Sequence, residues 1–194
     1  MSSKDSTFLT IVTGLPRSGT SMMMKMLSAG GMEVLTDNVR QADEDNPGGY
    51  YEFEAVKRTN EDSAWLQDAA GKAVKMIYML LADLPATHEY RVIFMQRDYP
   101  EVLASQQVML DRRGEKGADI STDKLTEIFD RQLMKTKDWL AAQPNFDVLY
   151  LDYPRVVDEP LPHANQIREF LARPLDARAM AGVVDPDLYR QRGD

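Results

Sequence analysis

A glycine-containing segment near the N-terminus carries one arginine and several hydroxyl groups. Residues 11–21 read Ile-Val-Thr-Gly-Leu-Pro-Arg-Ser-Gly-Thr-Ser, and an apolar run from Phe8 to Thr13 leads into the glycine loop. A methionine-rich helical pattern follows from Ser21, so the sequence predicts a strand, a loop and a helix N-terminus in that order. Unpaired first-turn N–H groups and the helix dipole attract negative charge, and glycine lets the backbone approach a phosphate closely. We therefore expect this loop to bind a phosphorylated ligand.

The loop departs from the phosphate-binding pattern of nucleoside triphosphatases, G-x-x-x-x-G-K-[ST]. Gly14 and Gly19 have the required spacing, but Thr20 stands where the pattern has lysine, and the cation lies inside the loop as Arg17. Such enzymes use the lysine on the β- and γ-phosphates and the following hydroxyl on Mg²⁺. Metal-assisted transfer of a γ-phosphoryl group is therefore disfavoured.

A second strand-to-helix turn carries another arginine. Residues 91–96, Arg-Val-Ile-Phe-Met-Gln, are typical of a buried strand and lead into Arg97. Asp98 is placed as a helix N-cap with Glu101 three residues later, and the helix continues through Ser105. A guanidinium can donate two parallel hydrogen bonds to a phosphate, which suits Arg97 to that role. Taken alone, the pattern also fits a surface cation and an ordinary helix residue.

Together these segments resemble the sulfotransferase family, which uses 3′-phosphoadenosine-5′-phosphosulfate (PAPS). The stretch Pro-Arg-Ser-Gly-Thr-Ser is similar to the family's 5′-phosphosulfate loop, and the resemblance spans roughly residues 8–192. It implies that Arg97 and Ser105 hold the 3′-phosphate. The residues that it assigns to the 5′-phosphosulfate loop are Arg17, Ser18, Gly19, Thr20 and Ser21.

The resemblance also implies a catalytic lysine but offers no histidine base. Val-Lys-Met at residues 74–76 is similar to the family segment whose lysine approaches the sulfonate and the bridging oxygen, which gives this role to Lys75. Many relatives carry a histidine two residues later as the general base, where this chain has Ile77. Neither His88 nor His163 is placed like a base. The proton acceptor must therefore be another group.

A carboxylate is the candidate for that proton acceptor. Residues 45–54 resemble the Asn-Pro-x-Gly-aromatic-x-Glu segment of bacterial and carbohydrate-type sulfotransferases, which often use a carboxylate base. Glu52 is the candidate and Glu54 the alternate. Burial among aromatic side chains raises the pKa of a carboxyl group, which suits a base that works near neutral pH. The alternative is that both acids open a helix running to about Ala70 and interact with its dipole.

The C-terminal end has a weaker match. Family members often close over the 3′-phosphate with a basic C-terminal segment, a role that the resemblance gives to Arg190 and Arg192. A frayed terminus is the alternative. Met22 stands where the family often has tryptophan, so adenine stacking has to come from another residue. The methionines at 22, 23, 24 and 26 are expected to pack in the core.

Composition limits the partners and the compartment. The formal net charge of −8 over 194 residues argues against nucleic acid and anionic membranes, so the arginines must form a local positive pocket in an acidic protein. No apolar run approaches the length of a membrane span, and the N-terminal residues lack the apolar centre of a secretion signal, which predicts a cytoplasmic protein. With no cysteine and two histidines, a metal site is not expected.

Alternating strands and helices predict a mostly parallel α/β sheet with helices on both faces, in one domain over residues 1–194. The resemblance implies a P-loop-like three-layer sandwich. Arg17, Lys75 and Arg97 each follow a predicted strand, so they converge on the edge of the sheet where such folds bind ligands. Strands are predicted at 8–13, 33–35, 73–76, 91–96 and 148–153, and helices at 21–30, 53–70, 100–112, 122–141 and after 153, with a mobile loop at 114–121.

The reaction expected from these residues is sulfonate transfer from PAPS to a hydroxyl or amine of a small-molecule, lipid or carbohydrate acceptor. Glu52 takes the acceptor proton, while Lys75 and Arg17 stabilise charge on the transferring group. Two other functions remain open on sequence alone: a P-loop kinase of a small metabolite and a non-catalytic nucleotide-binding module.

Overall fold

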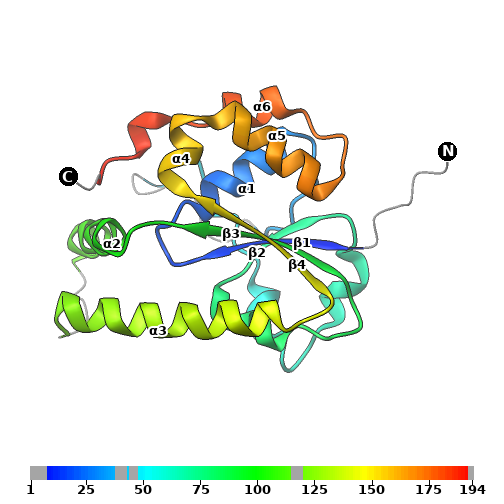
Figure 1. Ribbon diagram of the computed structural model, residues 1–194, viewed down its shortest axis with the longest axis horizontal. Helices are drawn as coiled ribbons and strands as arrows, with labels where there is room; N and C mark the ends of the chain where they lie inside the picture. The colour runs from blue at the N-terminus through cyan, green and yellow to red at the C-terminus, as the bar shows by residue number, and fades with distance from the viewer. Residues whose placement is uncertain (1–7, 38–42, 44–47, 115–119, 192–194) are drawn as a thin grey trace.

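Four parallel strands form one sheet in the computed structural model, which describes residues 8–37, 43, 48–114 and 120–191 (Figure 1). The strands are β1 (Leu9–Gly14), β2 (Ala73–Lys75), β3 (Tyr90–Gln96) and β4 (Phe146–Asp152), in the spatial order β2-β1-β3-β4. Every residue of β1 is buried, because helices cover both faces of a parallel sheet. The predicted α/β class, with a mostly parallel sheet between two layers, is confirmed.

Helices of unequal length make the outer layers. On one side of the sheet lie α1, α4, α5 and α6, on the other lies α3, and α2 lies at the edge where β3 ends (Figure 1). Among the described residues, no helix is both long enough and apolar enough to cross a membrane. The bounds are α1 (Thr20–Ala29), α2 (Tyr99–Arg113), α3 (Thr122–Ala141), α4 (Tyr153–Asp158), α5 (Pro160–Leu171) and α6 (Ala177–Gly182), with 3₁₀ helices η1 (Glu54–Arg58), η2 (Ala64–Asp68), η3 (Tyr78–Asp83) and η4 (Pro186–Leu188).

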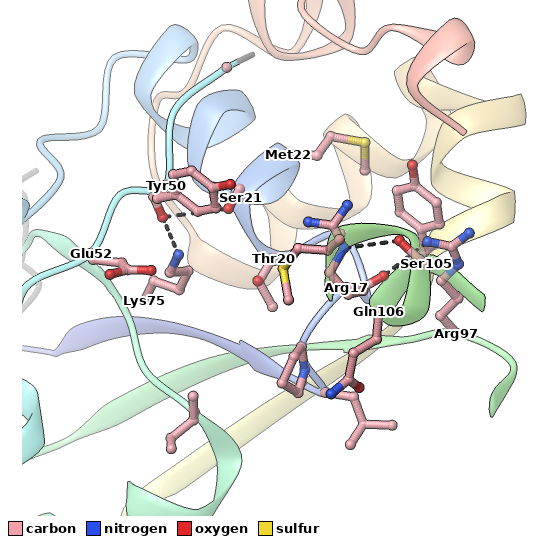
Figure 2. Close-up of a pocket in the computed structure, with 18 of the residues that line it drawn as sticks. Arg17, Thr20, Ser21, Met22, Tyr50, Glu52, Lys75, Arg97, Ser105 and Gln106 are labelled. Atoms are coloured by element: carbon pink, nitrogen blue, oxygen red, sulfur yellow. Dashed lines mark hydrogen bonds between the residues drawn. The ribbon is translucent and has the colours of Figure 1, made fainter. Parts of the chain in front are cut away.

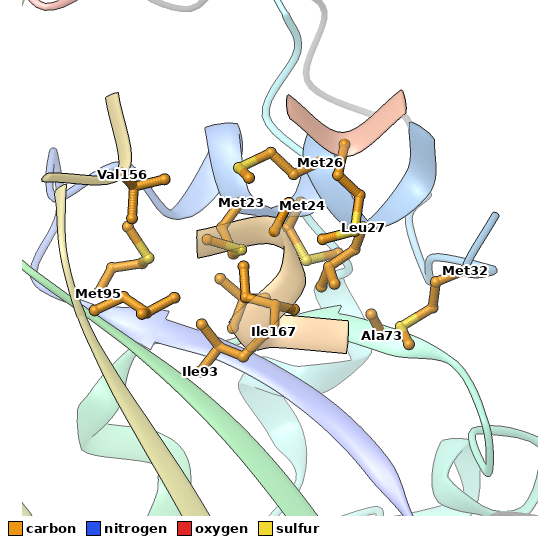
Figure 3. Close-up of a cluster of buried hydrophobic side chains, with 14 of the residues drawn as sticks. Met23, Met24, Met26, Leu27, Met32, Ala73, Ile93, Met95, Val156 and Ile167 are labelled. Carbon is orange, nitrogen blue, oxygen red and sulfur yellow. The ribbon is translucent and has the colours of Figure 1, made fainter. Parts of the chain in front are cut away.

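Methionines fill the core between α1 and the sheet. Met23, Met24 and Met26 are fully buried and belong to one cluster with Ile93 of β3 and Ile167 of α5 (Figure 3). Unbranched, flexible side chains adapt to the irregular space between a short helix and a twisted sheet. The predicted role in packing therefore holds for these three residues. Met22 differs, because it is half-buried and lines a pocket.

The other face of the sheet is covered by α3 and the 3₁₀ helices η1, η2 and η3. The bounds of α3 are those predicted, and the Ser121 hydroxyl accepts a hydrogen bond from the Lys124 N–H as its N-cap. Leu133 and Leu140 of α3 belong to the same buried cluster as Val56 and Leu66 from η1 and η2.

Two local predictions are wrong. Residues 53–70 form η1 and η2 rather than one helix, because the intervening Thr-Asn-Glu-Asp-Ser run favours turns, and the Asp62 carboxylate accepts from the Ala64 N–H. The aromatic rings of Phe53 and Trp65 meet edge to face across this turn, 5.9 Å between centroids. The predicted strand at 33–35 is a single bridge between Val34 and Ala73. Most of the predicted loop at 114–121 lies outside the described residues.

Gly14, at the end of β1, lies very close to the backbone of β3, and Gly31 provides a comparison without such a contact. Gly14 has φ +149°, and a Cβ there would lie 2.4 Å from the Met95 carbonyl oxygen and 2.5 Å from the Ser18 Oγ. Gly31 also has a positive φ, +95°, but a Cβ there meets nothing within 4 Å. Gly14→Ala should lower the free energy of unfolding by about 2–5 kcal/mol, from strain plus clash. Gly31→Ala should cost about 1–2 kcal/mol, from strain alone.

Denaturant unfolding of both variants measures this difference. Equal losses would contradict the close contact between Gly14 and the Met95 backbone.

Candidate functional site

The carboxyl ends of β1, β2 and β3 open into one pocket of about 440 Å³. Parallel strands end at the same edge of a sheet, so the residues that follow them are brought together. Arg17 follows β1, Lys75 ends β2 and Arg97 follows β3, and all three line the pocket (Figure 2). The predicted convergence of these cations is present in the structure.

The lining is basic although the protein is acidic. The described acidic residues of the lining are Glu52 and Asp185. Such a concentration of positive charge in a concave site attracts and binds anions. The basic residues of the lining are Arg17, Lys25, Lys57, Lys75, Arg97, Arg112 and Arg190.

The loop between β1 and α1 is shaped by left-handed backbone. Gly19, the N-cap of α1, has φ +90°, and a Cβ there would lie 2.2 Å from the Tyr153 ring at the start of α4. Arg17 has φ +71° without being glycine. Backbone in this region is unfavourable for a side chain and is retained where the surroundings or a function require it. The N-terminus of α1 therefore faces the pocket across a tightly packed loop.

The hydroxyl groups of this loop have different surroundings. Ser18 is buried, and both its N–H and its hydroxyl donate to the Leu15 carbonyl, so it stabilises the loop and is not part of the pocket lining. Thr20 and Ser21 line the pocket at the first turn of α1. The Ser21 hydroxyl donates to the Tyr50 carbonyl at 3.5 Å.

The two arginine segments predicted to bind phosphate are in direct contact. The Arg17 Nε donates to the Ser105 Oγ at 2.9 Å, and the Arg97 Nη1 donates to the Arg17 carbonyl oxygen at 3.0 Å (Figure 2). Residues from β1–α1 and from β3–α2 thus make one continuous hydrogen-bonded surface. An anion with two charged groups can therefore meet both arginines in the same pocket.

The Arg97 side chain is buried by partners that the sequence did not reveal. Its Nε donates to the Glu101 Oε2 at 2.8 Å, and both side chains are 5% exposed. Its Nη2 donates to the Gln191 carbonyl at 2.5 Å. The guanidinium carbon lies 4.8 Å from the centroid of the Tyr153 ring and 5.2 Å from that of Tyr189.

Glu101 joins Arg97 to the C-terminal segment. Its Oε1 accepts from the Tyr189 hydroxyl at 2.6 Å, so each carboxylate oxygen has a donor. The interpretation of Asp98 and Glu101 as a capping pair is wrong in part: the Asp98 side chain makes no capping bond to α2. The missed signal was the four-residue spacing from Arg97 to Glu101, which places them on one side of a helix start.

Lys75 lies at the opposite end of the pocket from Arg97 (Figure 2). Its ammonium group donates to the Tyr50 carbonyl, the same oxygen that accepts from Ser21. The backbone around this carbonyl is left-handed at Gly49, φ +86°, and at Tyr51, φ +51°. The Tyr50 hydroxyl in turn donates to an Asp43 carboxylate oxygen at 2.6 Å. Residues 48–52 therefore form a short segment across the site that is held by hydrogen bonds at Tyr50, and we call this segment the strap.

The structure separates the two candidate carboxylates. Glu52 lines the pocket, and its carbonyl accepts from the Asp37 N–H at 3.1 Å and the Thr36 hydroxyl at 3.1 Å. Glu54 is not part of the lining and forms an exposed ion pair with Lys57 at 2.6 Å. Geometry thus favours Glu52 for chemistry within the pocket.

Of the two C-terminal arginines predicted to bind the nucleotide, one lies within the described residues. Arg190 lines the pocket, whereas Arg192 lies outside the described residues. Residues 45–47 of the turn before the strap also lie outside them. Within the described part of the chain, no group of three His, Cys, Asp or Glu residues is arranged to hold a metal ion.

Comparison with solved structures places this geometry in a known fold. The sulfotransferase domain of the Synechococcus PCC 7002 olefin synthase superposes with a TM-score of 0.57 and 16% identity, over 100% of this chain and 83% of that one. The sulfotransferase domain from the curacin biosynthetic pathway gives 0.54 and 15%, over 93% and 88%. The chain has the sulfotransferase fold.

At these identities the likeness shows the fold alone. A sugar kinase from Janibacter sp. HTCC2649 aligns with a TM-score of 0.45 and 11% identity, too weak to support an argument. No family model matches the sequence, and no curated protein does.

The buried ion pair makes a stability prediction. Arg97→Ala removes the guanidinium that pairs with the Glu101 carboxylate, which is 5% exposed, and should lower the free energy of unfolding by about 3–5 kcal/mol. The double variant Arg97→Ala/Glu101→Ala removes both members of the pair and should lose less than the two single variants combined. Denaturant unfolding of the three variants measures this coupling. Strict additivity would mean that the pair does not interact in solution.

Proposed function

We propose that this chain is a PAPS-dependent sulfotransferase. The observation that carries the proposal is the contact between Arg17, Ser105 and Arg97 at the carboxyl edge of the sheet. A ligand with phosphate groups at both ends of its ribose needs two such cation sites a short distance apart. The sulfotransferase fold supports the same reading, and so does the missing lysine of the triphosphatase loop.

The nucleotide is bound by the two arginine segments. Arg97 and Ser105 hold the 3′-phosphate, while Arg17, Thr20, Ser21 and the adjacent loop N–H groups hold the 5′-phosphosulfate end. Arg97 now donates to neutral carbonyls of Arg17 and Gln191, and phosphate oxygens are stronger acceptors than carbonyls. Arg190 closes the site from the C-terminal side.

The reaction is an in-line displacement at sulfur. The acceptor oxygen or nitrogen forms the new bond to sulfur, the bond from sulfur to the bridging phosphate oxygen breaks, and adenosine 3′,5′-bisphosphate leaves. Glu52 takes the acceptor proton, and Lys75 and Arg17 stabilise the negative charge on the sulfonate and the leaving oxygen. The Tyr50 carbonyl accepts from one of the three N–H donors of the Lys75 ammonium group and holds this cation at the edge of the pocket.

The acceptor binds beside Glu52. The pocket lining also contains apolar side chains, which we call the apolar wall and which favour a hydroxyl or amine on a small molecule or lipid with an apolar body over a carbohydrate. The residues of this wall are Phe53, Val56, Met76, Ile77, Leu80, Val108 and Met109.

Nucleotide choice tests the proposal. The unaltered chain should bind adenosine 3′,5′-bisphosphate about 30-fold more tightly than ADP, because a charged hydrogen-bonded contact contributes about 2 kcal/mol or more. Calorimetry without Mg²⁺ measures both affinities. Ser105→Ala should weaken the bisphosphate more than ADP, since it removes a contact to the 3′-phosphate as well as the acceptor for Arg17. Equal affinities, or a strict need for Mg²⁺, would exclude the sulfotransferase proposal and favour the kinase.

The proposed base has a matched control two residues away. Glu52→Gln should leave nucleotide affinity and folding intact and lower turnover by roughly 10²–10⁴-fold, the usual contribution of a general base. Glu54→Gln should have little effect, because the exposed Glu54 carboxylate pairs with Lys57 and is not part of the pocket lining. Labelled PAPS with an acceptor library gives the turnover. Normal turnover in Glu52→Gln would assign the proton to another group.

A further inference from the structure

A buried carboxylate holds the arginine that faces the second phosphate. Glu101 receives one hydrogen bond from the Arg97 Nε and one from the Tyr189 hydroxyl, at 2.8 and 2.6 Å. Glu101 is 5% exposed and Tyr189 is 9% exposed. Charge-assisted bonds of this length are among the strong hydrogen bonds in proteins, so the three groups form a fixed unit.

The directions of these hydrogen bonds decide which N–H donors of Arg97 face the pocket. Glu101 takes the Nε side of the guanidinium, and the two Nη groups donate to the carbonyls of Arg17 and Gln191. The rings of Tyr153 and Tyr189 lie within 4.8 and 5.2 Å of the guanidinium carbon and restrict its plane. The Nη groups are therefore oriented before any ligand arrives, and their present acceptors are neutral.

We propose that Glu101 and Tyr189 are positioning residues that orient Arg97 toward the 3′-phosphate, and that the C-terminal segment 189–191 forms part of that subsite through Tyr189. The inference rests on the proposed function, since it needs a nucleotide with a 3′-phosphate at Arg97. Neither residue touches the reacting atoms, so both act through Arg97.

An opposite effect of Glu101 has to be distinguished from positioning. Its negative charge, next to Arg97, also repels an incoming phosphate. If this repulsion dominates, Glu101 weakens the binding of the nucleotide. Glu101→Asp keeps the charge but withdraws the carboxylate by one methylene from Arg97 and Tyr189. Glu101→Gln keeps the length but removes the charge. The two variants therefore separate orientation from charge.

The experiment measures the affinity for adenosine 3′,5′-bisphosphate and for AMP, which differ only by the 3′-phosphate. The dissociation constant for AMP divided by that for the bisphosphate isolates the contribution of the 3′-phosphate. A purely structural defect weakens both ligands and does not change this ratio. Glu101→Asp should reduce the ratio about 10-fold, the fold-change expected when a charged hydrogen bond is lost. Tyr189→Phe keeps the ring and removes the hydroxyl, and should reduce the ratio by a smaller factor.

Asp98→Asn is the matched control. Asp98 is an exposed acid in the same strand-to-helix turn, and its side chain makes no capping bond. The ratio should stay unchanged in this variant. Thermal unfolding establishes that each variant folds, and if Glu101→Asp does not, Tyr189→Phe provides the test alone.

Three outcomes are decisive. If the unaltered chain does not prefer the bisphosphate to AMP, the proposed function itself fails. If it does prefer the bisphosphate, and Glu101→Asp and Tyr189→Phe keep the full ratio, the positioning role is overturned while the function stands. If Glu101→Gln raises the ratio, Glu101 repels the 3′-phosphate and is not a positioning residue.

Discussion

Several cations share one pocket in this protein, and the rest of the site depends on how their charge is held. Arg17, Lys75 and Arg97 line the same pocket because three parallel strands end at one edge of the sheet. Like charges at close range repel, and a buried cation without acceptors is costly. Hydrogen bonds to the Ser105 hydroxyl, to backbone carbonyls and to one buried carboxylate meet that need before a ligand binds.

Most of these acceptors are neutral, which keeps the pocket positive. Tyr50 and Gln191 each present a main-chain oxygen to a cation, and Arg17 does so while its own guanidinium contacts Ser105. The left-handed residues Arg17 and Tyr51 lie at or next to two of these carbonyls.

The sequence was informative where local pattern and burial agree. Strand β3 was predicted because residues 91–96 contain a continuous apolar run, and helix α3 was predicted with the bounds that the structure has. The single helix predicted at 53–70 is wrong, because the turn-forming run that begins at Thr59 separates η1 from η2. The convergence of the cations followed from topology alone.

Contacts between distant segments could not be derived in the same way. Glu101 and Tyr189 are 88 residues apart, and no spacing in the chain links them. Glu52 and Glu54 have the same residue type and nearly the same position, and only the path of the strap distinguishes the one that lines the pocket. Nor does the sequence reveal that the Ser18 hydroxyl donates to the Leu15 carbonyl within the loop.

The edge-to-face contact between Phe53 and Trp65 gives the molecule an optical property. The chain has two tryptophans, and Trp65 contacts a ring that belongs to the apolar wall of the pocket. Trp139 packs against Phe146 at the start of β4, the end of the sheet away from the site. Indole emission depends on the local environment, so one chromophore reports on that wall while the other serves as an internal reference. Acceptor binding can thus be followed without attaching a dye.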